Sequence, residues 1–243
     1  MSGVISSPPL FGASPSATLQ QMWNTIRVRA AGVTDEQMQI EFLQAARDFF
    51  SESLAWQNDQ SLAIAAPTTT VSTAGWLAGG TVITGAEVVA PLDVRFNDIS
   101  LAPVAAVSDT AAAEVNTPQV YTFNLSGLIT LVPQPNSAGG TLHIFVGLRP
   151  TIVTPVIPDV QLSQWFDGLL DGTLTRLYEQ PGKPFSNAAL AMVHAKRFRA
   201  RISKARDIAN RGFGRGGAPW SFPYFANGSG ANLWGWGKGV RSG

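Results

Sequence analysis

Hydrophobic residues near the start of the chain recur every three or four positions, which is the spacing of an amphipathic helix. In the first stretch, Ser14-Pro15 offers a cap and a first-turn proline, and the pattern ends near Gly32. In the second, Thr34 begins a capping box, and the pattern runs to about Trp56. Two helices are predicted, with the apolar residues Leu19, Met22, Trp23, Ile26 and Ala30 in the first and Met38, Phe42, Ala45 and Phe49 in the second.

Residues 58–157 consist of short runs rich in Thr and Val, separated by Gly and Pro. β-branched and aromatic residues favour a pleated sheet, and the prolines and glycines divide the segment into short strands. Strands are predicted at 93–96 and 142–146, and a hairpin is predicted that joins 120–123 to 128–132. The segment therefore predicts an inserted all-β domain.

Helical spacing returns after Pro158-Asp159, an N-cap candidate, and predicts one helix that stops at Pro181-Gly182. Gly168 and Gly172 lie inside this helix, where each costs about 1 kcal/mol relative to Ala. We therefore expect another helix to approach closely at these glycines. The apolar face of the predicted helix comprises Leu162, Trp165, Phe166, Leu169, Thr173 and Leu177.

A fourth helix is predicted to begin at the Asn187 cap. Its apolar stripe is made of small residues, which let a neighbouring helix come close, and its basic faces are expected to point to solvent or to another chain. The stripe comprises Ala191, Ala195, Phe198, Ile202, Ala205 and Ala209, and the basic residues are Lys196, Arg197, Arg199, Arg201, Lys204 and Arg206.

The last 32 residues contain ten glycines and seven aromatic residues with no helical or strand period. Such a segment makes no core by itself, and we expect an extended arm that docks into a partner subunit. The predicted fold class is α+β: a small antiparallel helical bundle with an inserted all-β domain and a C-terminal arm. Its predicted parts are an N-terminal extension (1–15), the helical bundle (16–57 and 158–211), the β domain (58–157) and the arm (212–243).

Charge is divided unevenly along the chain. The formal net charge of the 243 residues is only +1. Residues 1–180 hold 6 basic and 15 acidic side chains, a net charge of −9, and residues 181–243 hold 11 basic and 1 acidic, a net charge of +10. This asymmetry predicts two functional surfaces, one of which meets an anionic partner or an acidic part of another copy.

Composition narrows the class of protein. An apolar content of 45% is too high for a disordered chain and suits a globular one. The absence of cysteine excludes disulfides, thiolate metal sites and cysteine nucleophiles. No apolar run approaches the roughly 20 residues that span a bilayer, so no membrane partner is expected. The first 15 residues lack a basic start followed by an apolar block, so no signal peptide is expected.

Glycine motifs follow the fourth predicted helix. Residues 212–217 match G-x-G-x-x-G, but they follow a helix and have no acidic residue after them, so no dinucleotide site is expected. Arg211 and Arg215 with Phe213 resemble an RGG element, which suits single-stranded nucleic acid. The alternative is an assembly arm in which the same residues contact protein. The basic helix itself could contact duplex phosphates.

No catalytic site, cofactor or metal site is expected. His143 alternates with apolar residues in a strand, and His194 lies among cations with no acidic partner nearby in the sequence. No nucleophile, base and orienting group can be named together. The candidate carboxylate pairs, which lack such companions, are Asp93 with Asp98 and Asp167 with Asp171.

Over roughly residues 16–212 the chain resembles the head-to-tail connector, or adaptor, proteins of tailed bacteriophages. The most specific part is the run 177–186, Leu-Tyr-Glu-Gln-Pro-Gly-Lys-Pro-Phe-Ser, which leads into the Ala-rich basic helix. The other parts are the run 42–50, Phe-Leu-Gln-Ala-Ala-Arg-Asp-Phe-Phe, followed by Leu54-Ala55-Trp56, Leu148-Arg149-Pro150, Pro158-Asp159 and Trp165-Phe166.

This resemblance implies a non-enzymatic virion protein at the head-to-tail interface, assembled in the host cytoplasm. It implies a ring, usually of twelve copies, that docks beneath the portal protein after DNA packaging and gives tail or nozzle proteins a platform. Genomic DNA would pass through the channel, and the C-terminal arm of such proteins commonly reaches toward the portal. The alternative function is nucleic-acid binding by the fourth helix and the RGG-like segment.

The predicted partner-binding residues all belong to the basic helix and the arm that follows it. They are Arg197, Arg201, Lys204, Arg211, Arg215, Trp220, Phe222, Tyr224, Phe225, Trp234 and Trp236.

Overall fold

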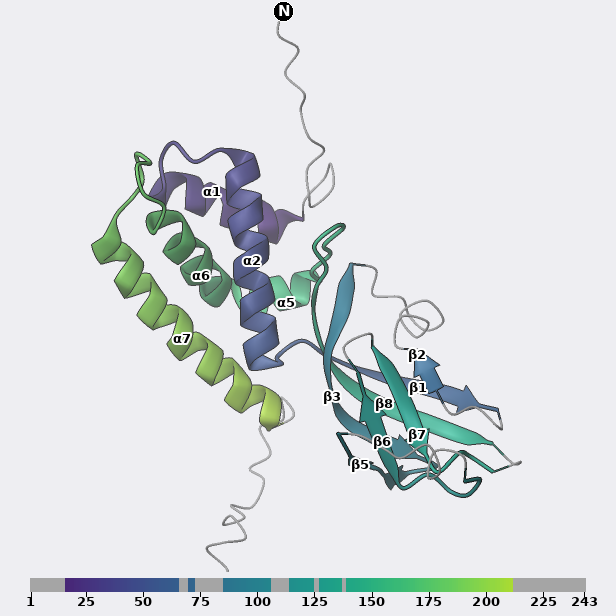
Figure 1. Cartoon of the computed structure of the whole chain (residues 1–243). Helices are drawn as coiled ribbons and strands as arrows, with labels where there is room; N and C mark the ends of the chain where they lie inside the picture. Colours follow the sequence, from purple (N-terminus) through teal and green to yellow (C-terminus); the bar gives the residue numbers. More distant parts are fainter. Residues whose placement is uncertain are drawn as a thin grey trace, which may run out of the picture.

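The computed structural model describes residues 16–65, 70–72, 85–105, 114–124, 127–136 and 139–211, and the fold is α+β, as predicted (Figure 1). Among these residues there are five helices and two four-stranded sheets, and every strand lies between α2 and α5 in the sequence. The helices are α1 (Ala17–Arg29), α2 (Asp35–Ser53), α5 (Asp159–Gln164), α6 (Phe166–Tyr178) and α7 (Ala188–Asn210). The strands are β1 (Gln57–Ile64), β2 (Thr70–Ser72), β3 (Ala86–Phe96), β4 (Ile99–Ser100), β5 (Ala102–Pro103), β6 (Val120–Phe123), β7 (Leu128–Val132) and β8 (Gly140–Pro150).

The first two helices begin at side-chain caps. In α2, the Thr34 hydroxyl accepts a hydrogen bond from the amide of Gln37, which confirms the predicted cap. In α1, the cap is Ser16 rather than Ser14, because the Ser16 hydroxyl accepts from the Leu19 amide; Ser14 and Pro15 lie outside the described residues. All nine predicted apolar residues of the two helices are buried.

The strands form two sheets, with the orders β1-β8-β3-β4 and β2-β7-β6-β5. The predicted hairpin is confirmed, since β6 and β7 are antiparallel and Val120 pairs with Val132. Along β8, the side chains of Leu142, Ile144 and Val146 are buried while those between them are at least partly exposed. Most of the buried apolar residues of both sheets belong to one hydrophobic core that continues into the helices.

The helix predicted from Pro158-Asp159 to Pro181-Gly182 is wrong in one respect, because the chain breaks at Trp165. This residue has φ −110° and ψ 17°, ends α5 and precedes α6. The N-cap is Pro158, one of the two residues of the predicted Pro158-Asp159 cap, and it makes no side-chain hydrogen bond. The break separates α5, which contacts α1, from α6, which packs on α2 and α7.

Close helix packing at the two glycines of α6 is confirmed. A Cβ atom at Gly168 would lie 2.8 Å from Cε2 of Phe49 in α2. A Cβ atom at Gly172 would lie 2.6 Å from Cε2 of Phe198 in α7. The rings of Phe49 and Phe198 are 6.1 Å apart, so the glycines make room for two aromatic rings on one face of α6.

Three charged residues join α2 to the strands. Arg47 of α2 donates to the Pro150 carbonyl at 2.6 Å and to the Glu87 carboxylate of β3 at 2.8 Å. Arg149 of β8 donates to the same carboxylate at 2.5 Å. Beside them, Trp56 is buried and its carbonyl accepts from the Leu148 amide. These contacts fix how the first sheet meets the helices.

Candidate assembly interface

Helix α7 carries most of the predicted partner-binding residues that the structure describes. Its cap is Asn187, as predicted, and the small stripe packs toward α6 and α2 (Figure 1). The last turn of the helix reaches the strands, where Gln57 of β1 donates to the Ala209 carbonyl at 3.5 Å. Arg197, Lys204 and Arg211 are exposed. Because seven residues are close to two turns, these three cations follow one flank of α7.

Arg201 lies between that flank and the core, and it is paired within the chain. Its guanidinium lies 3.1 Å from Oδ2 of Asp167 and 3.4 Å from Oδ2 of Asp171, both in α6. The expectation that all basic residues of this helix point to solvent or another chain is therefore wrong for Arg201. The Asp167 and Asp171 pair belongs to helix packing, which the sequence spacing alone did not indicate.

His194 also packs against α6. Its Nδ1 lies 2.8 Å from Oδ1 of Asp171, and the two residues are only 6% and 5% exposed. No acidic residue is near His194 in the sequence, and its partner comes from a helix 23 positions earlier in the chain. With Arg201, this carboxylate has partners for both oxygens, which is how a buried charge is accommodated.

The other cations of α7 occupy the opposite flank. Lys196 and Arg199 are exposed, and no ion pair involves them among the described residues. Arg206 donates to the backbone carbonyl of Glu52 at 2.8 Å, which holds the end of α7 against the end of α2. Helix α7 therefore presents two basic flanks, on either side of its buried stripe.

Apolar side chains accompany the first of these flanks. Leu190 and Val193 are 42% and 46% exposed, and they lie on the same side of the helix as Arg197. Between this flank and the junction of α5 with α6 is a cleft of about 270 Å³, lined by Ser163, Phe166, Asp167, Arg201 and Lys204 among others. Mixed cationic and apolar surface is typical of protein interfaces.

An acidic surface lies on the outer face of the first sheet. Asp59 of β1 and Asp93 of β3 both pair with Phe145 of β8, so the two carboxylates flank one partly exposed aromatic ring. Asp98 lies in the turn after β3 and its side chain is 92% exposed. We call the face formed by Asp59, Asp93, Asp98 and Phe145 the acidic sheet face.

Two further polar residues share this face. Arg95 pairs with Asp93 at 2.6 Å, and His143, as expected of a structural residue, is hydrogen-bonded to Ser61 at 2.7 Å. Three carboxylates against one guanidinium leave the face negatively charged. No group of histidine and carboxylate residues in the described part of the chain has the arrangement of a metal site.

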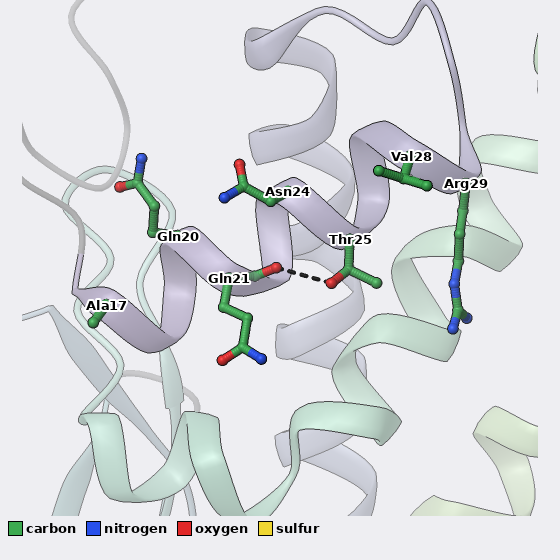
Figure 2. Close-up of a pocket in the computed structure, with 7 residues that line it drawn as sticks. All are labelled: Ala17, Gln20, Gln21, Asn24, Thr25, Val28 and Arg29. Atoms are coloured by element: carbon green, nitrogen blue, oxygen red, sulfur yellow. Dashed lines mark hydrogen bonds between the residues drawn. The ribbon is translucent and has the colours of Figure 1, made fainter.

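The exposed side of α1 forms an open cleft of about 580 Å³ (Figure 2). Thr25 donates to the Gln21 carbonyl at 2.9 Å, and Arg29 is the one charged residue of those lining it. A lone guanidinium among amides and aliphatic groups provides no acid and base pair. The lining residues are Ala17, Gln20, Gln21, Asn24, Thr25, Val28 and Arg29.

The remaining predicted partner-binding residues lie outside the described part of the chain. These are Arg215, Trp220, Phe222, Tyr224, Phe225, Trp234 and Trp236, and their proposed role stays a prediction. What the sequence analysis missed is the acidic sheet face. The only signal for it was the alternation in the strands that contribute to it, which puts Asp59 and Asp93 on the exposed side.

None of the helices that the structure describes combines the length and the apolar character of a membrane span. The model of a family described as SU10 adaptor protein matches residues 17–220, most of the chain. No curated protein matches the sequence.

Proposed function

This chain belongs to the SU10 adaptor protein family, a family of phage head-tail adaptors, and on that premise we propose that it forms a ring below the portal and carries the tail. Family membership makes it a structural virion component that associates with other virion proteins. The ring, the portal contact and the tail platform are the proposal.

The observation that carries the proposal is the separation of two oppositely charged surfaces. Arg197, Lys204 and Arg211 follow α7, and the carboxylates of Asp59 and Asp93 lie on the sheet. A ring with head-to-tail contacts joins two different faces of one chain, and these two faces are complementary in charge. In this arrangement the helices form the bundle and the strands the inserted domain.

We further propose that residues 212–243 are the arm that reaches the portal or a neighbouring copy. Seven aromatic residues and ten glycines in 32 positions support this, because buried aromatic anchors supply much of the affinity of protein interfaces. Family membership also favours a structural role over an enzymatic one.

Deletion of residues 212–243 tests the arm. We expect the shortened chain to keep the wild-type circular dichroism spectrum and to lose its association with portal assemblies in co-sedimentation. A second variant tests the aromatic anchors and keeps the length of the chain. It replaces with serine only the aromatic residues Trp220, Phe222, Tyr224 and Phe225. Undiminished portal association by both variants would overturn the proposal that residues 212–243 bind the portal or a neighbouring copy.

A second candidate function, nucleic-acid binding, is favoured by the exposed cations of α7. Lys196, Arg197, Arg199 and Lys204 have no ion-pair partner among the described residues. This candidate predicts submicromolar binding to single-stranded DNA that weakens steeply from low to moderate salt. Fluorescence anisotropy with a labelled oligonucleotide tests it, and no binding at low salt would remove it.

A further inference from the structure

We propose that the flank of α7 formed by Arg197, Lys204 and Arg211 binds the acidic sheet face of a second copy of this chain. The inference rests on the proposed ring and identifies the two surfaces that meet between neighbours. It assigns a partner to each surface: the cations of one copy face Asp59 and Asp93 of the next.

On the helix side, the three cations are free to bind a partner. Arg201, which lies beside them, is held by Asp167 and Asp171, whereas Arg197, Lys204 and Arg211 have no acidic partner among the residues described. Leu190 and Val193 add apolar surface to the same flank. An anion and an apolar group are therefore both needed to complement it.

On the sheet side, the acidic sheet face provides both. Asp59 and Asp93 flank Phe145, whose ring is partly exposed in the middle of the face. The Arg95 guanidinium and the Ser100 hydroxyl each donate to one oxygen of Asp93, whereas Asp59 and Asp98 are exposed carboxylates. Carboxylates around an aromatic residue match cations beside aliphatic residues.

The spacing of the charges also agrees. Asp59 and Asp93 lie on the two strands next to β8, opposite the same residue, so their backbones are two interstrand spacings apart, about 9.6 Å. Arg197 and Lys204 are seven residues apart on a helix, about 10.5 Å along its axis. A helix laid across the strands therefore brings each cation to one carboxylate.

Within one chain these charges do not pair. Helix α7 runs along the helices, and only its last turn reaches the strands, where Gln57 of β1 donates to the Ala209 carbonyl at 3.5 Å. Among the described residues, no ion pair joins Arg197, Lys204 or Arg211 to Asp59 or Asp93. Contact between them joins two copies head to tail, which closes into a ring when the rotation allows it. Leu190 and Val193 favour a protein over DNA as the occupant, because phosphates gain nothing from aliphatic neighbours.

Charge reversal in the full-length chain tests the contact. We expect R197E/K204E and, separately, D59K/D93K to weaken self-association at least about tenfold in sedimentation velocity, which corresponds to about 1.4 kcal/mol. The matched control is K196E/R199E, which makes the same charge change on the other flank of α7. We expect it to change self-association less than about twofold. Circular dichroism and thermal unfolding establish that each variant is folded.

Mixing provides the decisive measurement. Each reversed variant fails to bind itself, because like charges then face each other. When copies of R197E/K204E and D59K/D93K alternate, every contact is complementary: one contact has the native charges on both sides, and the next has the charges inverted on both sides. We therefore expect a one-to-one mixture to regain the wild-type assembly. A mixture that stays dissociated overturns the inference.

Other outcomes separate this interface from the function it rests on. Assembly of R197E/K204E at wild-type strength overturns the interface and leaves the ring proposal standing. A control variant impaired as much as R197E/K204E also overturns it, because the effect would then follow net charge.

DNA binding lost in R197E/K204E with self-association unchanged would identify DNA as the occupant. A wild-type chain that neither self-associates nor joins portal assemblies would contradict the proposed function itself.

Discussion

Arg47 and Arg149 come from distant parts of the sequence, yet both guanidinium groups bind the carboxylate of Glu87. Both arginines belong to the segments that carry the resemblance to phage adaptors, and the structure gives those segments a physical role. They connect α2 to β3 and β8, so they hold the sheet at a fixed position on the helices.

Replacing Glu87 with Gln should therefore destabilise the protein. Arg47 is only 12% exposed, and the substitution leaves its guanidinium mostly buried without a counter-charge. We expect a loss of about 1–3 kcal/mol in the free energy of unfolding, measured with urea. The control is Asp35→Asn in the exposed Arg27–Asp35 pair, where we expect less than about 1 kcal/mol. Equal effects of both substitutions would contradict this role for Glu87.

The run 177–186 is explained by contacts of the same kind. The Tyr178 hydroxyl donates to the Arg29 carbonyl at 3.0 Å, and Gln180 donates to Glu41 at 2.7 Å. The Tyr178 carbonyl accepts from the Asn187 amide, and Phe185 is buried. The turn between α6 and α7 is thereby tied to α1 and α2, which accounts for the specificity of this motif.

Tyr178→Phe tests one of these contacts and its pH dependence. At neutral pH, loss of the hydrogen bond should cost about 0.5–1.5 kcal/mol. Burial raises the pKa of Tyr178 above 10.0, against the lowering effect of Arg29, so the native state holds this proton more tightly than the unfolded state does. The contribution of this hydroxyl to the free energy of unfolding is fully present below pH 10.0 and is lost as the pH rises above it.

The variant lacks that ionisation, so its stability should fall less steeply than that of wild type in urea titrations at alkaline pH. Part of the alkaline loss should remain in both proteins, because burial and Asp93 also raise the pKa of Tyr121. Parallel stability profiles of variant and wild type would contradict the assignment to Tyr178.

At the scale of elements, the apolar pattern predicted α1, α2 and α7 and the β6–β7 hairpin, since each has its own cap, turn or alternation. The break at Trp165 was not predictable, because Leu162, Trp165, Phe166 and Leu169 keep helical spacing across it. Tertiary packing decides it: the Trp165 ring lies 5.6 Å from that of Phe49. Local periodicity carries no information on such a contact.

The two glycines of α6 should differ in their tolerance of a methyl group. At Gly168 the obstacle is Phe49, which is fully buried between Phe50 and Trp165 and cannot move. At Gly172 it is Phe198, which is partly exposed and can turn outward. We expect G168A to lose about 1–3 kcal/mol and G172A less than about 1 kcal/mol, because helix propensity offsets part of the strain.

Thermal unfolding of the pair checks this order. The double variant G172A/F198L should lose less stability than the two single variants lose together, because the smaller side chain makes room for the new methyl group. If G172A proved more damaging than G168A, the packing of Phe198 would be as rigid as that of Phe49, contrary to this account.

For the whole molecule, the division of charge along the sequence survives folding. Among the described residues, five arginines of residues 1–180 form ion pairs with carboxylates of that same part of the chain. They are Arg27, Arg47, Arg95, Arg149 and Arg176. After residue 180, ion pairs in the described part of the chain join Arg201 and His194 to carboxylates of the first part. Composition indicated two complementary surfaces, but only the strand register and the helix packing identify which carboxylates and cations remain available.

The junction between helices and strands leads to a last prediction, that the protein unfolds in one transition. The chain crosses the junction twice, and Trp56 fills it: the side chain is 2% exposed and its ring meets that of Phe50 edge to face at 5.5 Å. Trp56→Ala should cost about 3–5 kcal/mol and uncouple the two parts. Calorimetry should then show two transitions, with helical circular dichroism following one of them.

Trp23→Ala is the matched control, because Trp23 is also buried but lies in α1, away from the strands. It should lower stability by a similar amount while leaving a single transition in which calorimetry and circular dichroism coincide. Two transitions in both variants would mean that any large core truncation separates the parts, and a single transition in Trp56→Ala would place the coupling in the Arg47, Glu87 and Arg149 contacts instead.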